Sequence, residues 1–394
     1  MNKQDELHDA YVRHQIGLLR VAGSIRVDTL ELLDATEADL ADTIRRRTRG
    51  GMSVLGTQRL AKLRDEIAAI RAKAWDAIDP MWKKGMQDLT ESESQYLRAA
   101  IISVSPVVLE LDLPETALLR SLITSLPFEG RTLRQWSRKV RQDDLNRIMT
   151  AIQIGVVQGE NPNQLARRVV GTVGLRGTNG VTEVTRRAAA ALTRTAVNHY
   201  ANQAKRLFAV ANRDILKEEL YVATLDSRTT AVCRANDGKR FPVGEGPIPP
   251  LHFNCRSLRV PLLDGKVLGT RPFKQSTERA LLERYAAAEG LPVVRTRNAL
   301  PRGHKTSFDV WSRGEIRRQT GTLPAAVNYQ QFLTRQSNSF QNDVLGTTRA
   351  RLFRRGNLTL DRFVNRAGDE IPLRDLVKLE RQAFIDAGLN PADF

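Results

Sequence analysis

Cysteine is scarce in this sequence, and so are aromatic residues and long apolar runs. Two cysteines among 394 residues exclude a secreted disulfide scaffold. Aromatic residues make up only 6% of the chain, so we expect a core of aliphatic side chains, mainly in helices. No stretch approaches the roughly 18–20 apolar residues of a membrane span. The opening MNKQDELHDAYVRH lacks the apolar region of a secretory signal. We therefore expect no membrane span and first folding in a reducing cytoplasm.

Acidic residues are outnumbered by basic ones, 44 against 61, which gives a formal net charge of +17. Such a charge attracts polyanions, and we rank nucleic acid and an acidic protein surface ahead of an anionic membrane. A basic surface without a specific partner stays as the alternative. A hydrophobic content of 41% supports folded cores. The length suits two or three domains, since one core stops growing at roughly 250–300 residues.

Helical spacing of aliphatic residues dominates the chain on both sides of its centre. Pro80 is expected to interrupt or end a helix, because proline removes a backbone donor. Thr132 precedes one expected helix, and Asn161-Pro162 suits an N-cap followed by a first-turn proline. The predicted helices cover about 3–49, 53–88 and 92–104, short helices within 114–170, a long alanine-rich helix over about 182–217, one over 276–289, and a helical tail over 325–394 that closes with a short helix at 372–387.

The centre of the chain has a different character. The residues ELYVATLD, 219–226, favour a strand, Asp237-Gly238 marks a tight turn before the return strand KRFPV, and RSLRVPLL, 256–263, favours a third strand. We therefore predict a mainly α protein with a small inserted antiparallel β unit, an α+β arrangement. The predicted parts are an N-terminal helical hairpin or arm over 1–113, a central domain over 114–265, and a basic linker (293–318) with a helical C-terminal region over 266–394.

The β unit contains both cysteines and one of the five histidines, as Cys233, His252 and Cys255. This set suggests zinc, with Asp226, Asp237 or a water as the fourth ligand. Alternatives are a disulfide formed outside the cytosol, a cysteine nucleophile with His252 as base, and two packed free thiols.

The same region resembles the Mu F-like minor head proteins of tailed bacteriophages, the phage head morphogenesis family. The resemblance rests on LTRTAVNHYAN (192–202), YVATLDSRTTAVCRANDGKRF (221–241) and PPLHFNCRS (249–257), and it covers about 130–360. Relatives commonly carry further cysteines where this chain has Thr230 and Ser257, which weakens the zinc interpretation and favours hydrogen-bonded packing. The motif positions that match are Arg194, Thr195, Asp226, Arg228, Thr229, Cys233, Asp237, Gly238, Lys239, Pro250, His252, Cys255 and Arg256.

The resemblance implies a non-enzymatic virion protein inside the capsid near the portal, present in the host cytoplasm during assembly. It implies association with the portal protein, with scaffold or major capsid protein as further candidate partners, and roles in head assembly and genome delivery. The net charge agrees with sequence-independent contact to packaged double-stranded DNA. Alternatives are a virion-delivered effector enzyme and a general DNA-binding protein.

Individual residues of this region receive structural and contact roles. We expect Arg194 to pair with Asp226 or to lie on a solvated helix face, and Arg228 and Thr229 to brace the turn. The candidate DNA or portal contacts are Arg45, Arg46, Arg47, Arg295, Arg297, Arg302, Lys305, Arg317, Arg318, Arg349, Arg351, Arg354 and Arg355, with Arg49 and Arg313 in the same basic sets.

Overall fold

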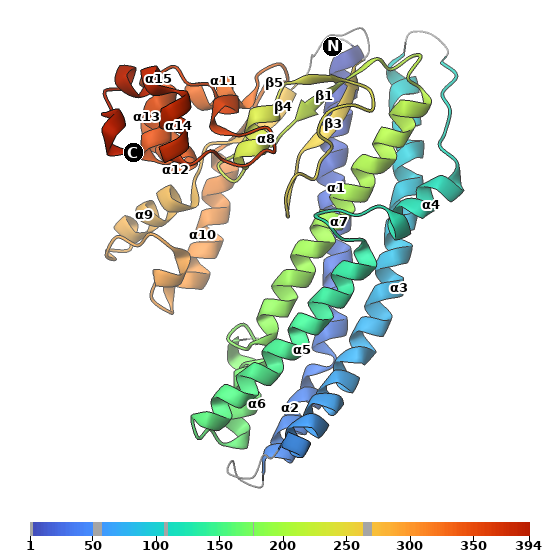
Figure 1. The fold of residues 1–394 in the computed structure, drawn as a ribbon, viewed down its shortest axis with the longest axis vertical. Coiled ribbons are helices and arrows are strands. Elements are labelled where there is room, and N and C mark those ends of the chain that lie inside the picture. The colour runs from blue at the N-terminus through green and yellow to red at the C-terminus, as the bar shows by residue number, and fades with distance from the viewer. Residues whose placement is uncertain (1–2, 50–56, 106–108, 176, 263–269) are drawn as a thin grey trace.

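A long helical bundle forms the largest part of the molecule (Figure 1). The structure, a computed structural model, describes residues 3–49, 57–105, 109–175, 177–262 and 270–394. Helix α7 packs against α1, α3 and α5, while α2 and α6 pack on each other at one end. The bundle helices are α1 (Lys3–Asp34), α2 (Glu37–Thr48), α3 (Thr57–Val104), α4 (Thr116–Ser125), α5 (Leu133–Val157), α6 (Pro162–Val170) and α7 (Thr182–Ala211), with the short η2 (Val173–Leu175).

The core of the bundle combines two tryptophans with the alanines of α7. Trp75 and Trp82 pack edge to face with ring centroids 6.2 Å apart, and both are buried. The indole N–H of Trp82 donates to the hydroxyl of Thr29 at 2.8 Å, so the one polar atom of that ring is satisfied. Buried Ala196 and Ala204 lie in the same core and leave room for the large rings. The alanine-rich helix is therefore the element around which the bundle closes.

Pro80 does not interrupt or end its helix, contrary to the prediction. Helix α3 continues through it from Thr57 to Val104. Pro80 lies on an exposed face, so the carbonyl that loses its helical partner is on the solvent side. Ile78 and Trp82, on either side of the proline, are buried in the bundle core and hold the helix in register.

The predicted 3–49 helix is instead two helices, with a break at Ala35-Thr36. The guanidinium of Arg71 on α3 reaches this break. It donates to the Leu33 carbonyl at 3.1 Å and to the Thr36 hydroxyl at 2.8 Å. The Leu33 carbonyl, which also accepts from the Thr36 N–H and hydroxyl, thus gains a charged donor from another helix.

The predicted helix starts at Thr132 and Asn161 are confirmed. Both residues form capping boxes, with side chains that accept from backbone N–H groups of the first turn. The helix that follows Thr132 has 25 residues, so the expectation of only short helices within 114–170 was wrong. Its length follows from buried positions at helical spacing, from Val140 through Ile148 to Ile152.

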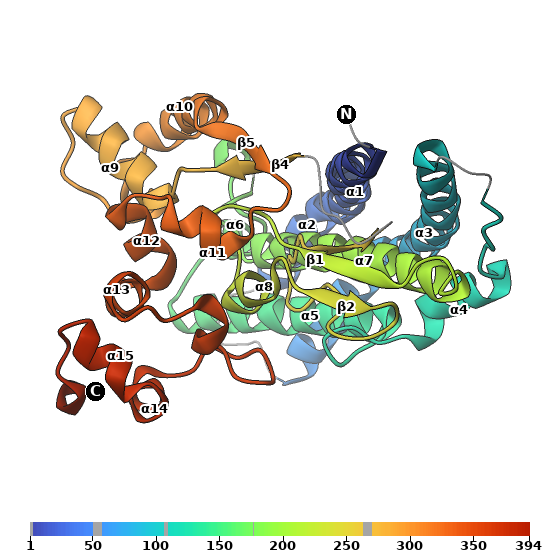
Figure 2. The same cartoon turned by 90° about the horizontal axis from the view of Figure 1, so that it is seen from above.

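A three-stranded antiparallel sheet of order β2-β1-β3 confirms the small β unit. Figure 2 shows β1 and β2 of this sheet near α8. Leu220 lies opposite Arg240 on one side and Val260 on the other. The sheet's apolar side chains share a core with Phe208 of α7 and Tyr11 of α1. The strands are β1 (Glu218–Val222), β2 (Arg240–Pro242) and β3 (Leu258–Leu262), and a short helix not predicted from sequence, α8 (Ala231–Asn236), lies between β1 and β2.

The C-terminal region is a set of short helices beside the bundle (Figure 1). The predicted basic linker over 293–318 is wrong as a linker, because it contains helix α10, whose Phe308 shares a core with Leu282 and Tyr285 of α9. The predicted closing helix at 372–387 is divided into two. The elements are β4 (Thr270–Lys274), α9 (Glu278–Ala288), η3 (Arg297–Ala299), α10 (His304–Arg318), β5 (Thr320–Pro324), α11 (Tyr329–Thr334), α12 (Asn338–Leu345), α13 (Thr347–Arg355), η4 (Leu360–Phe363), α14 (Leu373–Leu379), α15 (Arg381–Asp386) and η5 (Pro391–Asp393), with β4 and β5 paired antiparallel.

Among the helices of the described ranges, none has the length and apolar character that crossing a bilayer requires.

Candidate metal centre and the contacts that hold it

Cys233 lies in the first turns of α8, directly against the sheet. Its side chain is 1% exposed. The phenol of Tyr221, on β1, donates to its sulfur at 3.3 Å. The short helix between the strands therefore turns this sulfur inward, toward the loop that precedes β3.

Two successive turns of α7 hold that loop, residues 249–257, in place. Arg194 donates from Nε to the Asn254 side-chain oxygen at 2.8 Å, and the Asn254 N–H donates to the Thr195 hydroxyl at 3.0 Å. Asn198, one turn further, donates to the Cys255 carbonyl at 3.1 Å. The Arg-Thr pair thus positions the loop that carries His252 and Cys255. Asn198 was missed from sequence, although its i+4 spacing from Arg194 places it on the same face.

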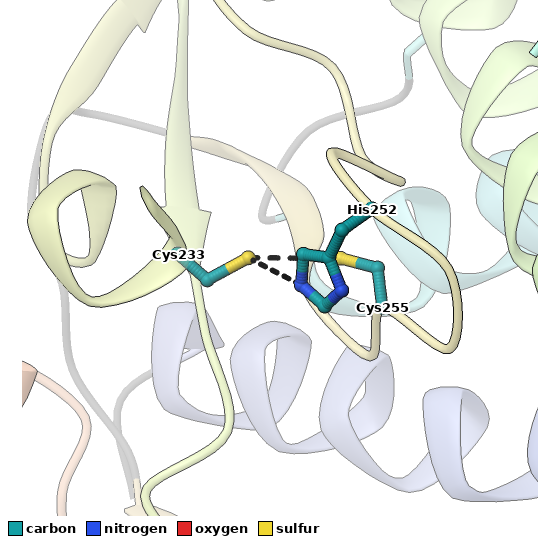
Figure 3. Close-up of side chains that lie close together, drawn as sticks. All are labelled: Cys233, His252 and Cys255. Atoms are coloured by element: carbon teal, nitrogen blue, oxygen red, sulfur yellow. Dashed lines mark hydrogen bonds between the residues drawn. The ribbon is translucent and has the colours of Figure 1, made fainter. Parts of the chain in front are cut away.

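The three predicted ligands meet at one point (Figure 3). The Cys233 sulfur lies 3.3 Å from His252 Nε2 and 3.7 Å from the Cys255 sulfur. All three ligand atoms lie within 4.8 Å of one another. Both cysteines are free thiols rather than a disulfide. The other nitrogen of His252, Nδ1, lies 2.8 Å from the Phe253 carbonyl oxygen.

The three side chains of the cluster shift one another's pKa values. A hydrogen bond from Cys255, helped by His252, outweighs burial and lowers the pKa of Cys233 to about 3. The same bond, together with burial, raises the pKa of Cys255. Burial alone would lower the pKa of His252, but the adjacent Cys233 sulfur outweighs it, so that the pKa is raised. Of the two thiols, Cys233 is thus the more acidic.

Asp226 is not a ligand and does not pair with Arg194. Arg256 binds it in a two-pronged contact, with N–O distances of 2.7 and 2.8 Å. The backbone N–H of Arg228 and the hydroxyl of Thr229 also donate to it and hold the turn. Arg256 takes the place predicted for Arg194 because the loop brings the Arg256 guanidinium to the Asp226 carboxylate. Arg194 instead donates to the Asn254 side chain.

Asp237 is a buried connector and not a ligand. Its carboxylate accepts from both terminal nitrogens of Arg271, each at 2.9 Å, and from the backbone N–H groups of Ala223 and Tyr329 at 2.6 Å each. Gly238 follows with a φ of +81°, as the tight turn requires. Lys239, next in the motif, is exposed, and Pro250 follows the cis Pro249–Pro250 bond of the loop.

The nucleophile interpretation of Cys233 and His252 meets a steric obstacle. A cavity of about 10 Å³ borders the cluster, lined by Thr224, Arg228, His252 and Asn254 among others. Such a space holds about one water molecule. Cys233, which lines this space, is only 1% exposed, and a substrate carbonyl with its flanking atoms is larger than one water. The carbonyl of Phe253, not a carboxylate, orients His252.

The structure divides the predicted basic contact residues into two groups. The residues with hydrogen bonds or ion pairs inside the chain are Arg45, Arg46, Arg47, Arg297, Arg318, Arg349, Arg351 and Arg354. Arg349 and Arg351, for example, donate to backbone carbonyls at 2.8 and 2.7 Å. Arg313 also bonds within the chain, to the Asp309 carbonyl. No residue of the described ranges bonds the side chains of the rest, Arg49 among them, and we call the five that lie after residue 265 the free basic set: Arg295, Arg302, Lys305, Arg317 and Arg355.

Comparison with known proteins gives one family match. Residues 146–259 match the model of the family described as Phage Mu protein F like protein, which confirms the resemblance within that segment of the expected 130–360. The matched segment runs from α5 to β3 and contains the whole cysteine–histidine cluster. No curated protein and no solved structure matches the chain significantly.

Proposed function

We propose, taking the match of residues 146–259 to the Phage Mu protein F like family as the premise, that this protein is a minor head protein of a tailed phage. The family is one of structural proteins of phage head morphogenesis. In our proposal the chain associates with the portal inside the head, contacts packaged double-stranded DNA, and acts in head assembly and genome delivery. The family match is the observation that carries this proposal.

The charge of the chain supports the DNA part of the proposal. The formal net charge is +17, and the free basic set leaves five cationic side chains without an internal partner in the described residues. Three of them, Arg302, Lys305 and Arg317, lie on α10 or just before it. Cations that are not neutralised by the protein itself are the ones able to replace counterions on phosphates.

The virion and portal parts are tested on particles. Purified, nuclease-treated virions and heads assembled without portal protein are compared by quantitative mass spectrometry. The proposal expects the chain in virions at a few copies per particle and its loss from heads that lack the portal. Absence from virions contradicts the proposed function, and equal amounts in both kinds of head contradict the portal association.

The DNA part is tested by the salt dependence of binding to duplex DNA. Changing the free basic set to alanine should make the log–log salt slope shallower by about 0.9 for each phosphate that the variant no longer neutralises. The matched control removes five exposed cations that have a local acidic partner: Lys84, Lys139, Arg187, Arg279 and Lys378. An unchanged slope in the first variant, or equal changes in both, contradicts DNA binding through the free basic set.

A further inference from the structure

We propose that Cys233, His252 and Cys255 bind one zinc ion, with a water molecule as the fourth ligand, and that this ion cross-links α8 to the loop held by α7. The inference is independent of the proposed function, because it rests on the geometry of the cluster alone.

The spacing of the ligand atoms is the first argument. With Zn–S bonds of about 2.3 Å and a Zn–N bond of about 2.0–2.1 Å, a tetrahedral site places its sulfurs about 3.8 Å apart and sulfur about 3.5 Å from nitrogen. The distances here are 3.7 Å between the sulfurs and 3.3 Å between the Cys233 sulfur and His252 Nε2. The chain therefore already holds two edges of the tetrahedron at nearly their final lengths.

The surroundings of His252 are the second argument. A carbonyl oxygen only accepts hydrogen bonds, so the Phe253 carbonyl at 2.8 Å fixes a proton on Nδ1. Nε2 is then the nitrogen that faces the sulfurs. A backbone carbonyl on the far nitrogen is a common outer partner of metal-binding histidines, because it fixes both the tautomer and the ring orientation.

The loop is also built in advance, which lowers the cost of assembling the site. Arg194, Thr195 and Asn198 hold it through Asn254 and the Cys255 carbonyl. Tyr221 holds the Cys233 sulfur from the other side. Neither ligand element has to be ordered at the moment of binding.

Charge and size select the ion. Two thiolates and a divalent cation sum to zero, so the filled site adds no net charge to a buried region. Two sulfurs and an imidazole suit zinc and exclude magnesium or calcium, which prefer oxygen ligands. The ion replaces the remaining protons of the cluster, which leave to solvent. The neighbouring cavity of about 10 Å³, which Cys233 and His252 line, has room for about one water as the fourth ligand.

The test is the metal content of the full-length protein, purified under reducing conditions without chelator. We expect about one zinc per chain by elemental mass spectrometry. The variants Cys233→Ser, Cys255→Ser and His252→Gln are each expected to lower it at least tenfold. His199→Gln is the matched control, since His199 is also buried but lies outside the cluster, and it should retain the metal.

A second measurement keeps the test valid if a variant fails to fold. Titration of the unmodified protein with an organomercurial that reacts with thiols should release the zinc in step with modification of the two cysteines. Cobalt substituted for zinc should show the charge-transfer absorption of thiolate ligands. Absence of zinc after incubation with the ion, a Cys233–Cys255 disulfide in the purified protein, or zinc that survives loss of both thiols would each overturn the proposal.

Discussion

The ion pair between Arg71 and Asp144 allows a quantitative test of how the bundle is held together. Arg71 on α3 is 2% exposed and Asp144 on α5 is 1% exposed. Their N–O distance is 2.6 Å. Arg71 also donates to the break between α1 and α2, and Asp144 accepts from the Thr185 hydroxyl of α7 at 2.5 Å. The pair therefore connects four elements at one point.

Asp144→Ala should destabilise the protein by about 3–5 kcal/mol, because it leaves the Arg71 guanidinium buried without its counter-charge. Replacement of both partners, as Arg71→Met with Asp144→Leu, should recover most of that loss, because neither charge then remains in the core. The Thr36 hydroxyl keeps its hydrogen bond to the Leu33 carbonyl, and the Thr185 hydroxyl, released from Asp144, can turn to a backbone carbonyl of α7.

The chain offers a matched control between the same two helices. Arg141 and Asp76 pair at 3.0 Å, but their side chains are 41% and 70% exposed. Asp76→Ala should therefore cost no more than about 1 kcal/mol. The assay is urea unfolding followed by far-ultraviolet circular dichroism, with the midpoint and slope of each variant compared. If Asp144→Ala and Asp76→Ala differ by less than about 1 kcal/mol, burial does not govern the strength of these pairs and the reasoning is refuted.

Three further predictions concern the loop, a buried histidine and the Asp237 connection. Thr195→Val should cost about 1 kcal/mol and speed hydrogen exchange at the Asn254 amide. Thr193→Val should leave the exchange rate of the Asn254 amide unchanged, because the Thr193 hydroxyl bonds only within its own helix. Burial lowers the pKa of His199 to about 4, below the unfolded value of about 6.5, so the unfolded chain binds more protons between these pH values. Stability should then fall by up to about 3 kcal/mol as pH decreases from about 6.5 to 4. His199→Gln should flatten this part of a plot of urea midpoint against pH. An equally steep plot for the variant contradicts the role of His199 in this pH dependence. Asp237→Ala should lower the free energy of unfolding by about 3–5 kcal/mol, because it leaves Arg271 buried without its counter-charge. Limited proteolysis should then cleave within 270–394 faster than in the control Asp375→Ala, whose ion pair is exposed. Equal cleavage rates contradict a connecting role for Asp237.

The parts of the fold that sequence predicts well are those set by local chemistry. Thr132 and Asn161 identify helix starts because a side-chain oxygen can cap only the residues just after it. The three strands follow from β-forming residues and the Asp237-Gly238 turn. The clustering of Cys233, His252 and Cys255 was also predictable, since all three lie within one small β unit.

The errors concern features that tertiary packing decides. Pro80 would end an isolated helix, but buried neighbours on both sides keep α3 continuous. The charge of 293–318 suggested a linker, yet a few apolar residues such as Phe308 are enough to pack α10 on α9. Pairing Arg194 with Asp226 required knowing that Arg256 lies nearer, which depends on the path of the loop. Whether the cluster holds zinc stays a prediction.

The way Asp237 joins the central and C-terminal regions limits how such a chain exchanges parts by recombination. One buried carboxylate from the cysteine-bearing segment bonds the backbone N–H of Tyr329 and the guanidinium of Arg271, both of which come after residue 265. A crossover near residue 266 that brought in a foreign C-terminal part would remove the only cation of the described residues that pairs with this carboxylate and leave it the Ala223 N–H alone. Gene fusions that keep the ancestral core intact should therefore preserve the chain at least through Tyr329, and joints placed earlier should be selected against.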